Sequence, residues 1–196
     1  MSLEAEKQGI VREIKTQITI LVGLVAFAWA LELLDIFVFN HQLDRFGIYP
    51  RAVIGLRGIV FAPFLHGGVF HLIANTIPFV VLGWLIMLRE TTDFFIVSAV
   101  SALVGGFGTW LLGRPSFHIG ASGVIFGFLG YLLARGWFDR KPLSIALSLF
   151  VGITYGSMIW GVLPLNRWVS WEGHLFGFLG GVLAARLISD RRAKIH

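Results

Sequence analysis

Six apolar segments constrain this chain more than any other feature of its sequence. Each has close to the roughly 20 residues that an α-helix needs to cross a bilayer, and charged, proline or polar residues end each one. The segments run from about residue 18 to 39, 66 to 88, 94 to 113, 122 to 138, 143 to 163 and 174 to 188. Because they are continuous rather than alternating, they exclude a β-barrel and predict an all-α polytopic membrane protein built as a six-transmembrane-helix bundle.

Composition and charge agree with this class and orient it. Of the 196 residues, 56% are hydrophobic and 14% charged, which is too apolar for a soluble domain. An even number of spans places both termini on one side, and 11 of the 16 lysines and arginines fall there. The positive-inside rule therefore predicts cytoplasmic segments at 1–17 and 189–196 around a six-helix domain at 18–188. The net charge of +5 suits anionic headgroups and indicates no nucleic-acid partner.

Two further patterns describe the ends and the first connection of the chain. The first 17 residues carry three glutamates and lack a small-residue cleavage site, so we expect neither a signal nor a transit peptide. The first outer connection, from Asn40 to Leu65, is longer than most loops and too apolar to be disordered. We expect short amphipathic, partly helical pieces on the membrane surface there; the alternative is a plain spacer.

The fourth and sixth segments share a local echo, "FGFLGYLLAR" from Phe126 and "FGFLGGVLAAR" from Phe176. Each helix carries a stripe of glycines at helical spacing, and such stripes let two backbones approach closely. We expect these two helices to be the closest pair, the alternative being that each stripe packs against another helix. The stripes are Gly123, Gly127 and Gly130 in the fourth segment and Gly173, Gly177 and Gly181 in the sixth.

Polar and ionisable residues gather near the outer ends of the spans, where their burial is costly and therefore indicates function. Ser122 begins the fourth segment within "GASGVIFGFLGY", and on that stretch alone close helix packing is the better explanation. His174, however, begins the sixth segment at matching depth. The complete set is Glu32, Asp35, His66, His71, Asn75, His118, Ser122 and His174.

A serine hydroxyl becomes a nucleophile when a base takes its proton, and histidine is the commonest base. We therefore predict a dyad of Ser122 and His174 without a carboxylate, because Glu172 lies two residues from His174 and points to nearly the opposite side of the helix. For Glu32 and Asp35, packing at the interface or toward a pore explains their presence at least as well.

Acyl transfer also needs donors aimed at the developing oxyanion. His71 and Asn75 are four residues apart and share one helix face, so their N–H groups are suitable, and the backbone N–H of Ser122 is a third donor. His66 lies five residues before His71 and is expected to brace the loop. Each residue alone is more often structural, but a nucleophile, a base and two donors at one depth predict catalysis.

These motifs resemble those of the rhomboid intramembrane serine proteases. The matching pieces are "GASG" around Ser122, "GHLFGFLGG" around His174, and "HGGVFHLIAN", which follow the family's order on its six-helix layout. The resemblance implies that Ser122 attacks the scissile carbonyl, that His174 acts as general base and then acid, and that His71, Asn75 and the Ser122 amide hold the oxyanion. The supporting residues are His66, Gly120, Gly123, Phe126, Gly177 and Gly181.

The resemblance also implies substrates that are membrane-spanning segments, cut near the outer membrane face after lateral access past the fifth helix with its Trp160. Two positions depart from the family. Phe126 stands where many relatives place a tyrosine that stacks on the catalytic histidine, so we expect stacking without the hydroxyl. The tryptophan–arginine pair common in the family's first outer loop is missing, which affects the loop's anchoring.

The sequence thus predicts a multi-pass intramembrane serine endopeptidase in a prokaryotic cell membrane, with its active site opening to the outer side. Its expected partners are transmembrane protein substrates and the lipid bilayer; no metal, cofactor or particular oligomeric state is predicted. The main alternative is a catalytically inactive rhomboid-like protein that binds transmembrane clients. A small transporter is a third alternative, which predicts inverted repeats, whereas the echo relates two helices of the same orientation.

Overall fold

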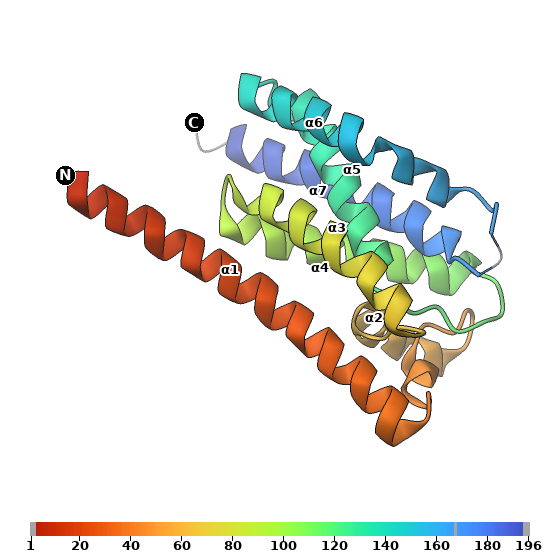
Figure 1. Ribbon diagram of the computed structural model, residues 1–196. Helices are drawn as coiled ribbons and strands as arrows, with labels where there is room; N and C mark the ends of the chain where they lie inside the picture. Colours follow the sequence, from red (N-terminus) through yellow and green to blue (C-terminus); the bar gives the residue numbers. More distant parts are fainter. Residues whose placement is uncertain (1–2, 167, 194–196) are drawn as a thin grey trace.

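The computed structural model describes residues 3–166 and 168–193, and this part of the chain is helical with short connections (Figure 1). The only extended pairing described is an isolated bridge between Ile48 and His118. The long helices are α1 (Leu3–Leu34), α3 (Val69–Met87), α4 (Thr91–Leu112), α5 (Ser122–Asp139), α6 (Pro142–Tyr155) and α7 (Trp171–Ala193). The prediction of an all-α chain is confirmed.

Several helix boundaries differ from the predicted segments for local reasons. Helix α1 begins at Leu3, well before residue 18, because the intervening residues are mostly good helix formers with acidic side chains in the first turn. Helix α3 begins at Val69 and not at 66, since Gly68 has a φ of +117° that no helical residue adopts. The fifth apolar segment divides into α6 and a 3-10 helix, η5 (Gly156–Val162).

Four helical stretches are long and apolar enough to cross a membrane: Leu3–Phe39, Val69–Met87, Thr91–Leu112 and Pro142–Val162. Helices α5 and α7 are not among them. They lie at the centre of the bundle, are rich in glycine, and bury much of their surface against the other helices. The crossing of the membrane by all six helices therefore stays a prediction.

Helices α5 and α7 make the most extensive contact between any two helices of the described chain. Their glycines permit it: a Cβ at Gly177 would overlap the carbonyl oxygen of Gly123, and one at Gly181 would overlap that of Gly127. The prediction that these two helices form the closest pair is confirmed. Helix α4 covers the other side of α7, where the Cα of Gly177 would lie 3.2 Å from a Cβ added at Gly105.

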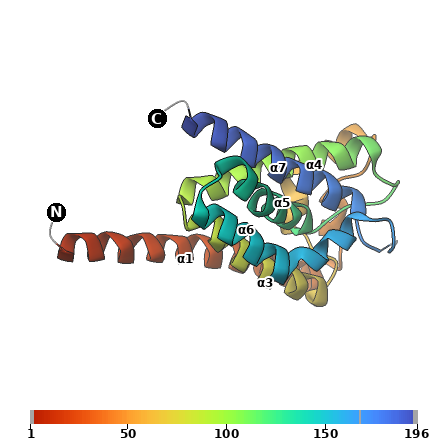
Figure 2. The same cartoon turned by 90° about the horizontal axis from the view of Figure 1, so that it is seen from above.

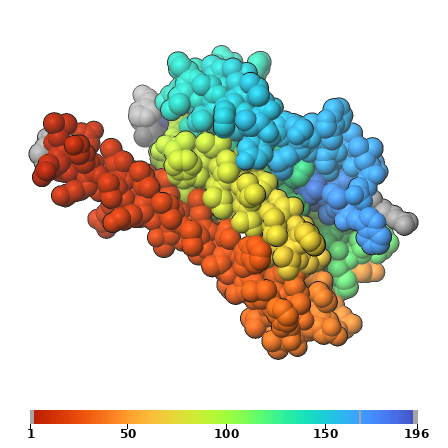
Figure 3. Space-filling view, viewed as in Figure 1, coloured from red at the N-terminus to blue at the C-terminus, as the bar shows by residue number. Residues whose placement is uncertain are grey.

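The remaining helices surround this central pair. Helix α6 packs on α5, where Ser148 receives the backbone N–H of Gly136 at 2.9 Å. Helix α1 runs along α3 on the surface of the bundle (Figure 3), and its N-terminal half projects beyond the other helices (Figure 2). An aromatic core of Phe79, Phe94 and Phe128 fills the space between α3, α4 and α5.

The connection from α1 to α3 is a series of short helical turns. A π-helical turn, η1 (Asp35–Phe39), is followed by η2 (Leu43–Phe46), η3 (Val53–Arg57), α2 (Gly58–Phe61) and η4 (Ala62–Phe64). Val53 and Val60 are largely exposed, while Ile59 is buried against α4. The bridge between Ile48 and His118 ties this connection to the loop that precedes α5, and so to the start of the helix that carries Ser122.

Candidate active site

Ser122 and His174 meet where α5 and α7 begin. Ser122 is the first residue of α5 and His174 lies in the first turn of α7. The Nε2 atom of His174 is 2.8 Å from the hydroxyl oxygen of Ser122, which is hydrogen-bond distance. The close approach of the two helices at their glycines thus brings a base to a hydroxyl across 52 residues of sequence.

The second ring nitrogen of His174 selects the tautomer. Its Nδ1 lies 2.9 Å from the carbonyl oxygen of Gly161 in η5, an atom that can only accept a hydrogen bond. Nδ1 therefore carries the proton, and Nε2 is left as the acceptor that faces Ser122. A backbone carbonyl takes the orienting position that a carboxylate holds in a serine-protease triad, and sequence reasoning missed this role of Gly161.

Phe126 fixes the plane of the same imidazole. It lies one helical turn after Ser122, and its ring stacks on that of His174 with centroids 4.0 Å apart and an interplanar angle of 8°. The histidine is thus held by a hydrogen bond at one nitrogen, by the serine at the other, and by an aromatic face. The stacking expected for Phe126 is present.

His71 and Asn75 converge on the backbone two residues before Ser122. A Cβ added at Gly120 would lie 2.8 Å from Nε2 of His71 and 3.7 Å from Nδ2 of Asn75, and Gly120 has a φ of +112°. The Nδ1 of His71 accepts the backbone N–H of Gly67 at 3.3 Å, so its Nε2 carries the hydrogen and is a donor. The side-chain donors of His71 and Asn75 therefore lie beside the backbone segment that precedes the Ser122 amide.

His66 lies just before α3, in contact with the loop that positions the serine. Its Nε2 accepts the backbone N–H of Ala121 at 3.5 Å, and its ring meets that of His71 edge to face with centroids 5.1 Å apart. Burial lowers the pKa of His66 to about 4, with a smaller contribution from His71, so it is neutral near pH 7. The structure thus places His66 against the loop that the sequence predicted it to brace.

A second serine–histidine contact, between His118 and Ser170, joins the loop before α5 to the start of α7. The Nε2 of His118 donates to the carbonyl of Arg114 at 3.0 Å, so its Nδ1 accepts the hydroxyl of Ser170 at 2.6 Å. Ser170 in turn caps α7 by accepting the N–H of Gly173 at 3.3 Å. Burial lowers the pKa of His118, which keeps this acceptor neutral.

Sequence reasoning included His118 among the polar residues but missed Ser170 as its partner. The only available signal was a serine directly before an apolar helix, which is typical of a cap. The carbonyl of Ser170 also accepts the N–H of His174 at 3.1 Å. Ser170 therefore connects His118 to His174, through its hydroxyl on one side and its backbone carbonyl on the other.

Neither Glu172 nor the acids of α1 reach His174. Glu172 is 1% exposed and accepts the backbone N–H and the Nε–H of Arg114 at 3.2 and 3.0 Å, so its carboxylate is directed away from the imidazole as expected. Glu32 lies in the last turn of α1 and Asp35 is the first residue of η1, where the first connection begins. Within the described residues, the one group with metal-ligand spacing is Asp35, His41 and Asp44, which does not include the dyad.

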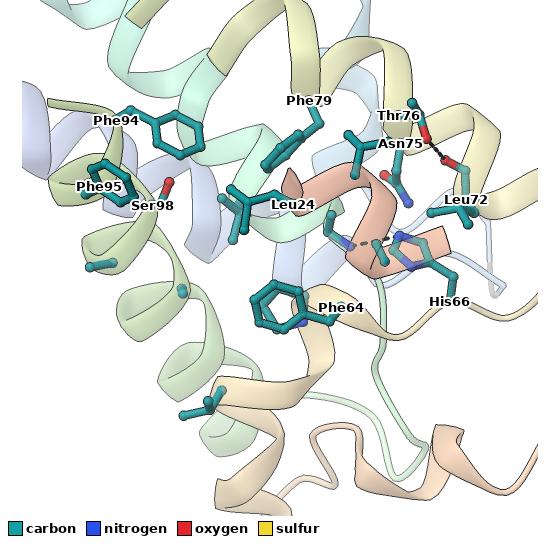
Figure 4. Close-up of a pocket in the computed structure, with 18 of the residues that line it drawn as sticks. Leu24, Phe64, His66, Leu72, Asn75, Thr76, Phe79, Phe94, Phe95 and Ser98 are labelled. Carbon is teal, nitrogen blue, oxygen red and sulfur yellow. Dashed lines mark hydrogen bonds between the residues drawn. The ribbon is translucent and has the colours of Figure 1, made fainter. Parts of the chain in front are cut away.

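A cavity of about 490 Å³ borders the site on the side of α1 and α4 (Figure 4). His66 and Asn75 lie at one edge of it, and Phe79 and Phe94 line the apolar remainder. The polar site therefore adjoins an apolar space between the helices, an arrangement that suits an apolar polypeptide or lipid better than a charged solute.

The comparisons with known proteins agree on one family. The model of the rhomboid domain matches residues 55–191. An uncharacterized protein of Mycobacterium tuberculosis is 42% identical over 187 residues, which is 90% of this chain and 78% of that one. RHOMBOID-like protein 1 of Arabidopsis thaliana is 32% identical over 127 residues, covering 61% of this chain and 31% of that one.

A further relative carries an activity in its name. A Bacillus subtilis protein, named as a candidate rhomboid protease, is 29% identical over 132 residues, or 66% of each chain. The family match, together with helices long and apolar enough to span a bilayer, makes the chain an integral membrane protein. The resemblance expected from the serine, histidine and asparagine motifs is confirmed, and the protein belongs to the rhomboid family.

Proposed function

We propose that this protein is an intramembrane serine endopeptidase that hydrolyses peptide bonds in or near transmembrane segments of other proteins. The observation that carries the proposal is the 2.8 Å contact between His174 Nε2 and the Ser122 hydroxyl, with Nδ1 held by the Gly161 carbonyl. Membership of the rhomboid family and the relative named as a candidate rhomboid protease support it.

In this mechanism, His174 removes the hydroxyl proton of Ser122 as the oxygen attacks the scissile carbonyl. The oxyanion is stabilised by the Nε2–H of His71, the amide of Asn75 and the backbone N–H of Ser122. His174 then protonates the leaving amine, and water, activated by the same imidazole, hydrolyses the acyl-enzyme. These residues complete the cycle without a cofactor or a metal.

The same proposal sets the placement of the domain in the membrane. Residues 18–188 form a six-helix protease domain, with α5 and α7 crossing at its centre and both termini in the cytoplasm. The active site opens to the outer side, and a substrate helix reaches it from the bilayer past α6 and η5, where Ile153 and Trp160 are 85% and 65% exposed. The bacterial relatives support a prokaryotic cell membrane.

The test is cleavage of a model transmembrane substrate by the purified full chain in detergent or nanodiscs. We expect Ser122→Ala and His174→Ala to lose at least about 10³-fold in kcat/KM, as in serine proteases that lose a member of the catalytic set. A fluorophosphonate probe should label the wild type and not the serine variant. Ser116→Ala is the matched control, because Ser116 is exposed in the loop before α5.

Equal cleavage by the wild type and both dyad variants would refute the assignment. Wild-type protein that binds the transmembrane substrate, releases it uncleaved and leaves the probe unreacted would instead favour the client-binding alternative. Loss of activity in Ser116→Ala as large as that in Ser122→Ala would show that the loop, and not the nucleophile, had been measured.

A further inference from the structure

Apart from the proposed dyad, the end of α1 and the first connection bring carboxylates and an imidazole together. Asp35 is the first residue of η1, and His41 and Asp44 follow in the connection. One ligand atom from each of these three side chains lies within 4.8 Å of the other two. Zinc holds nitrogen and oxygen ligands at about 2.0–2.2 Å, so small side-chain rotations bring atoms so placed onto one ion.

The backbone holds this group in a defined turn. Asn40 and His41 both have positive φ values, 49° and 59°, which reverse the chain directly after the π-helical turn. The N–H of His41 donates to the carbonyl of Asp35 at 3.0 Å, and the N–H of Leu43 donates to Oδ1 of Asp35 at 2.9 Å. The reversal of the chain therefore brings His41 back beside Asp35, where the turn begins.

Glu32 is a second, independent indication of a ligand. It lies three residues before Asp35 on α1 and is only 2% exposed, yet its Oε1 is buried without a hydrogen-bond partner. The backbone amides of His66 and Gly68 also face this carboxylate. A buried carboxylate oxygen without a donor is costly, and a bound cation is one way to compensate for it.

The charges around Asp44 show the same deficit of positive charge. The groups that face its carboxylate are Asp35, Glu32 and His41, so two of the three repel it, and its Oδ1 is also buried without a partner. Within residues 3–166 and 168–193, no lysine or arginine forms a salt bridge with the carboxylate of Glu32, Asp35 or Asp44.

Arg45 follows Asp44 directly but is exposed and forms no salt bridge within the described residues, and Arg57 is engaged elsewhere in the connection. Arg57 donates from Nη2 to the carbonyl of Arg45 at 2.9 Å, and its guanidinium lies 4.3 Å from the ring centre of Phe46. The carboxylates of the turn therefore lack a compensating side chain, while His41 is exposed and Asp44 half-buried, which leaves a path for an ion from solvent.

We propose that Asp35, His41 and Asp44 bind one divalent cation of the zinc class, with the buried Glu32 carboxylate supplying the remaining negative charge. One imidazole combined with carboxylates suits Zn²⁺, and Mn²⁺ less well, whereas Ca²⁺ prefers oxygen ligands alone. The ion ties the end of α1 to the first connection and, through Glu32, to the amides that precede α3. It takes no part in peptide hydrolysis, and the proposal is independent of that activity.

The experiment uses the full chain, prepared without a polyhistidine tag, in detergent and stripped with EDTA. After incubation with Zn²⁺ and gel filtration, we expect one bound zinc per chain by elemental analysis. Asp44→Asn and His41→Gln should each weaken zinc binding by more than the roughly 10- to 100-fold that loss of an outer-sphere partner costs. Asp190→Asn is the matched control, since its side chain is 64% exposed on α7.

Thermal unfolding separates loss of the ion from loss of the fold. In EDTA, Asp44→Asn should unfold at the wild-type temperature or above it, because the substitution removes like-charge repulsion. With Zn²⁺, the wild type and Asp190→Asn should gain stability, and Asp44→Asn should not.

Three outcomes would overturn the proposal. One is equal zinc binding by the wild type and Asp44→Asn. Another is zinc that is lost in His174→Ala but kept in Asp44→Asn, which would place the ion at the dyad. The third is stabilisation by Ca²⁺ or Mg²⁺ without any by Zn²⁺, which would reject the zinc class.

Discussion

The rings of Phe126 and His174 lie almost parallel, with centroids 4.0 Å apart and 8° between their planes. Stacking therefore requires no phenolic hydroxyl, and the aromatic face limits rotation of the imidazole between the Gly161 carbonyl and the Ser122 hydroxyl. Phe126, one helical turn after Ser122, thus orients His174 through ring contact alone.

Replacing the stacked ring tests this orientation. Phe126→Leu should lower kcat by about 10-fold, which corresponds to about 1.4 kcal/mol and to the upper range of an aromatic pair. Phe126→Tyr should stay within a few-fold of the wild type, because the stacked face is kept. The measurement is kcat on a transmembrane substrate, with Phe107→Leu on the exposed face of α4 as control. Equal kcat for the leucine and tyrosine variants would contradict the role of the ring.

The glycine contact between α5 and α7 predicts a large effect of one methyl group. Gly177→Ala places a Cβ against the carbonyl of Gly123, so we expect a loss of at least about 1–3 kcal/mol in the free energy of unfolding, with loss of activity as Ser122 and His174 separate. Gly23→Ala is the control, because nothing lies within 4 Å of its Cβ and alanine favours the helix. The two free energies of unfolding should change in opposite directions; a similar change in both would count against the close contact.

The cap of α7 predicts a separable effect on catalysis. Ser170→Ala removes both the hydroxyl that His118 accepts and the acceptor for the Gly173 N–H, so it should cost about 0.5–2 kcal/mol of stability. It should also lower kcat more than it raises KM, because loss of the two hydroxyl contacts loosens the turn whose backbone carbonyl accepts the N–H of His174. Ser170→Thr keeps a hydroxyl and should restore most of both. If the threonine variant is as impaired as the alanine variant, the hydroxyl does not carry the effect.

Asp44 predicts a pH dependence of stability in the absence of metal. Burial, with the carboxylates of Asp35 and Glu32, raises the pKa of Asp44 from 3.8 to about 6, and His41 opposes this in part. The folded state thus favours the protonated acid, so this contribution to stability is fully present below pH 3.8 and is lost as the pH rises through 6. Between pH 4 and 7 in EDTA, the unfolding temperature of the wild type should fall relative to that of Asp44→Asn. A constant difference between the two would contradict the raised pKa.

The parts of this site that could be predicted from sequence depend on short-range spacing and on membrane depth. Ser122 and His174 could be paired because each begins an apolar segment and because the glycines of both helices recur at helical spacing. His71 and Asn75 could be placed on one face because they are four residues apart. In both cases the helical repeat converts a spacing in the sequence into a position on a helix face.

The missed parts depend on backbone atoms and on contacts between distant segments. The carbonyl of Gly161 orients His174 only because the fifth apolar segment changes from an α-helix to a 3-10 helix at Gly156, and no residue pattern in that segment indicates the change. The contact between His118 and Ser170 spans 52 residues and two irregular loops. Helix α1 extends back to Leu3 because polar residues with good helix propensity continue the helix beyond its apolar segment, so the change in polarity at residue 18 does not mark the helix boundary.

The 3-10 helix η5 has a mechanical consequence. Gly161, whose carbonyl holds the imidazole, is adjacent to Trp160, which faces outward from the same turn. A displacement of this turn by an incoming polypeptide would carry the acceptor with it and let the imidazole rotate. Under the proposed function, arrival of a substrate at Trp160 and the orientation of His174 would therefore be coupled through one peptide unit.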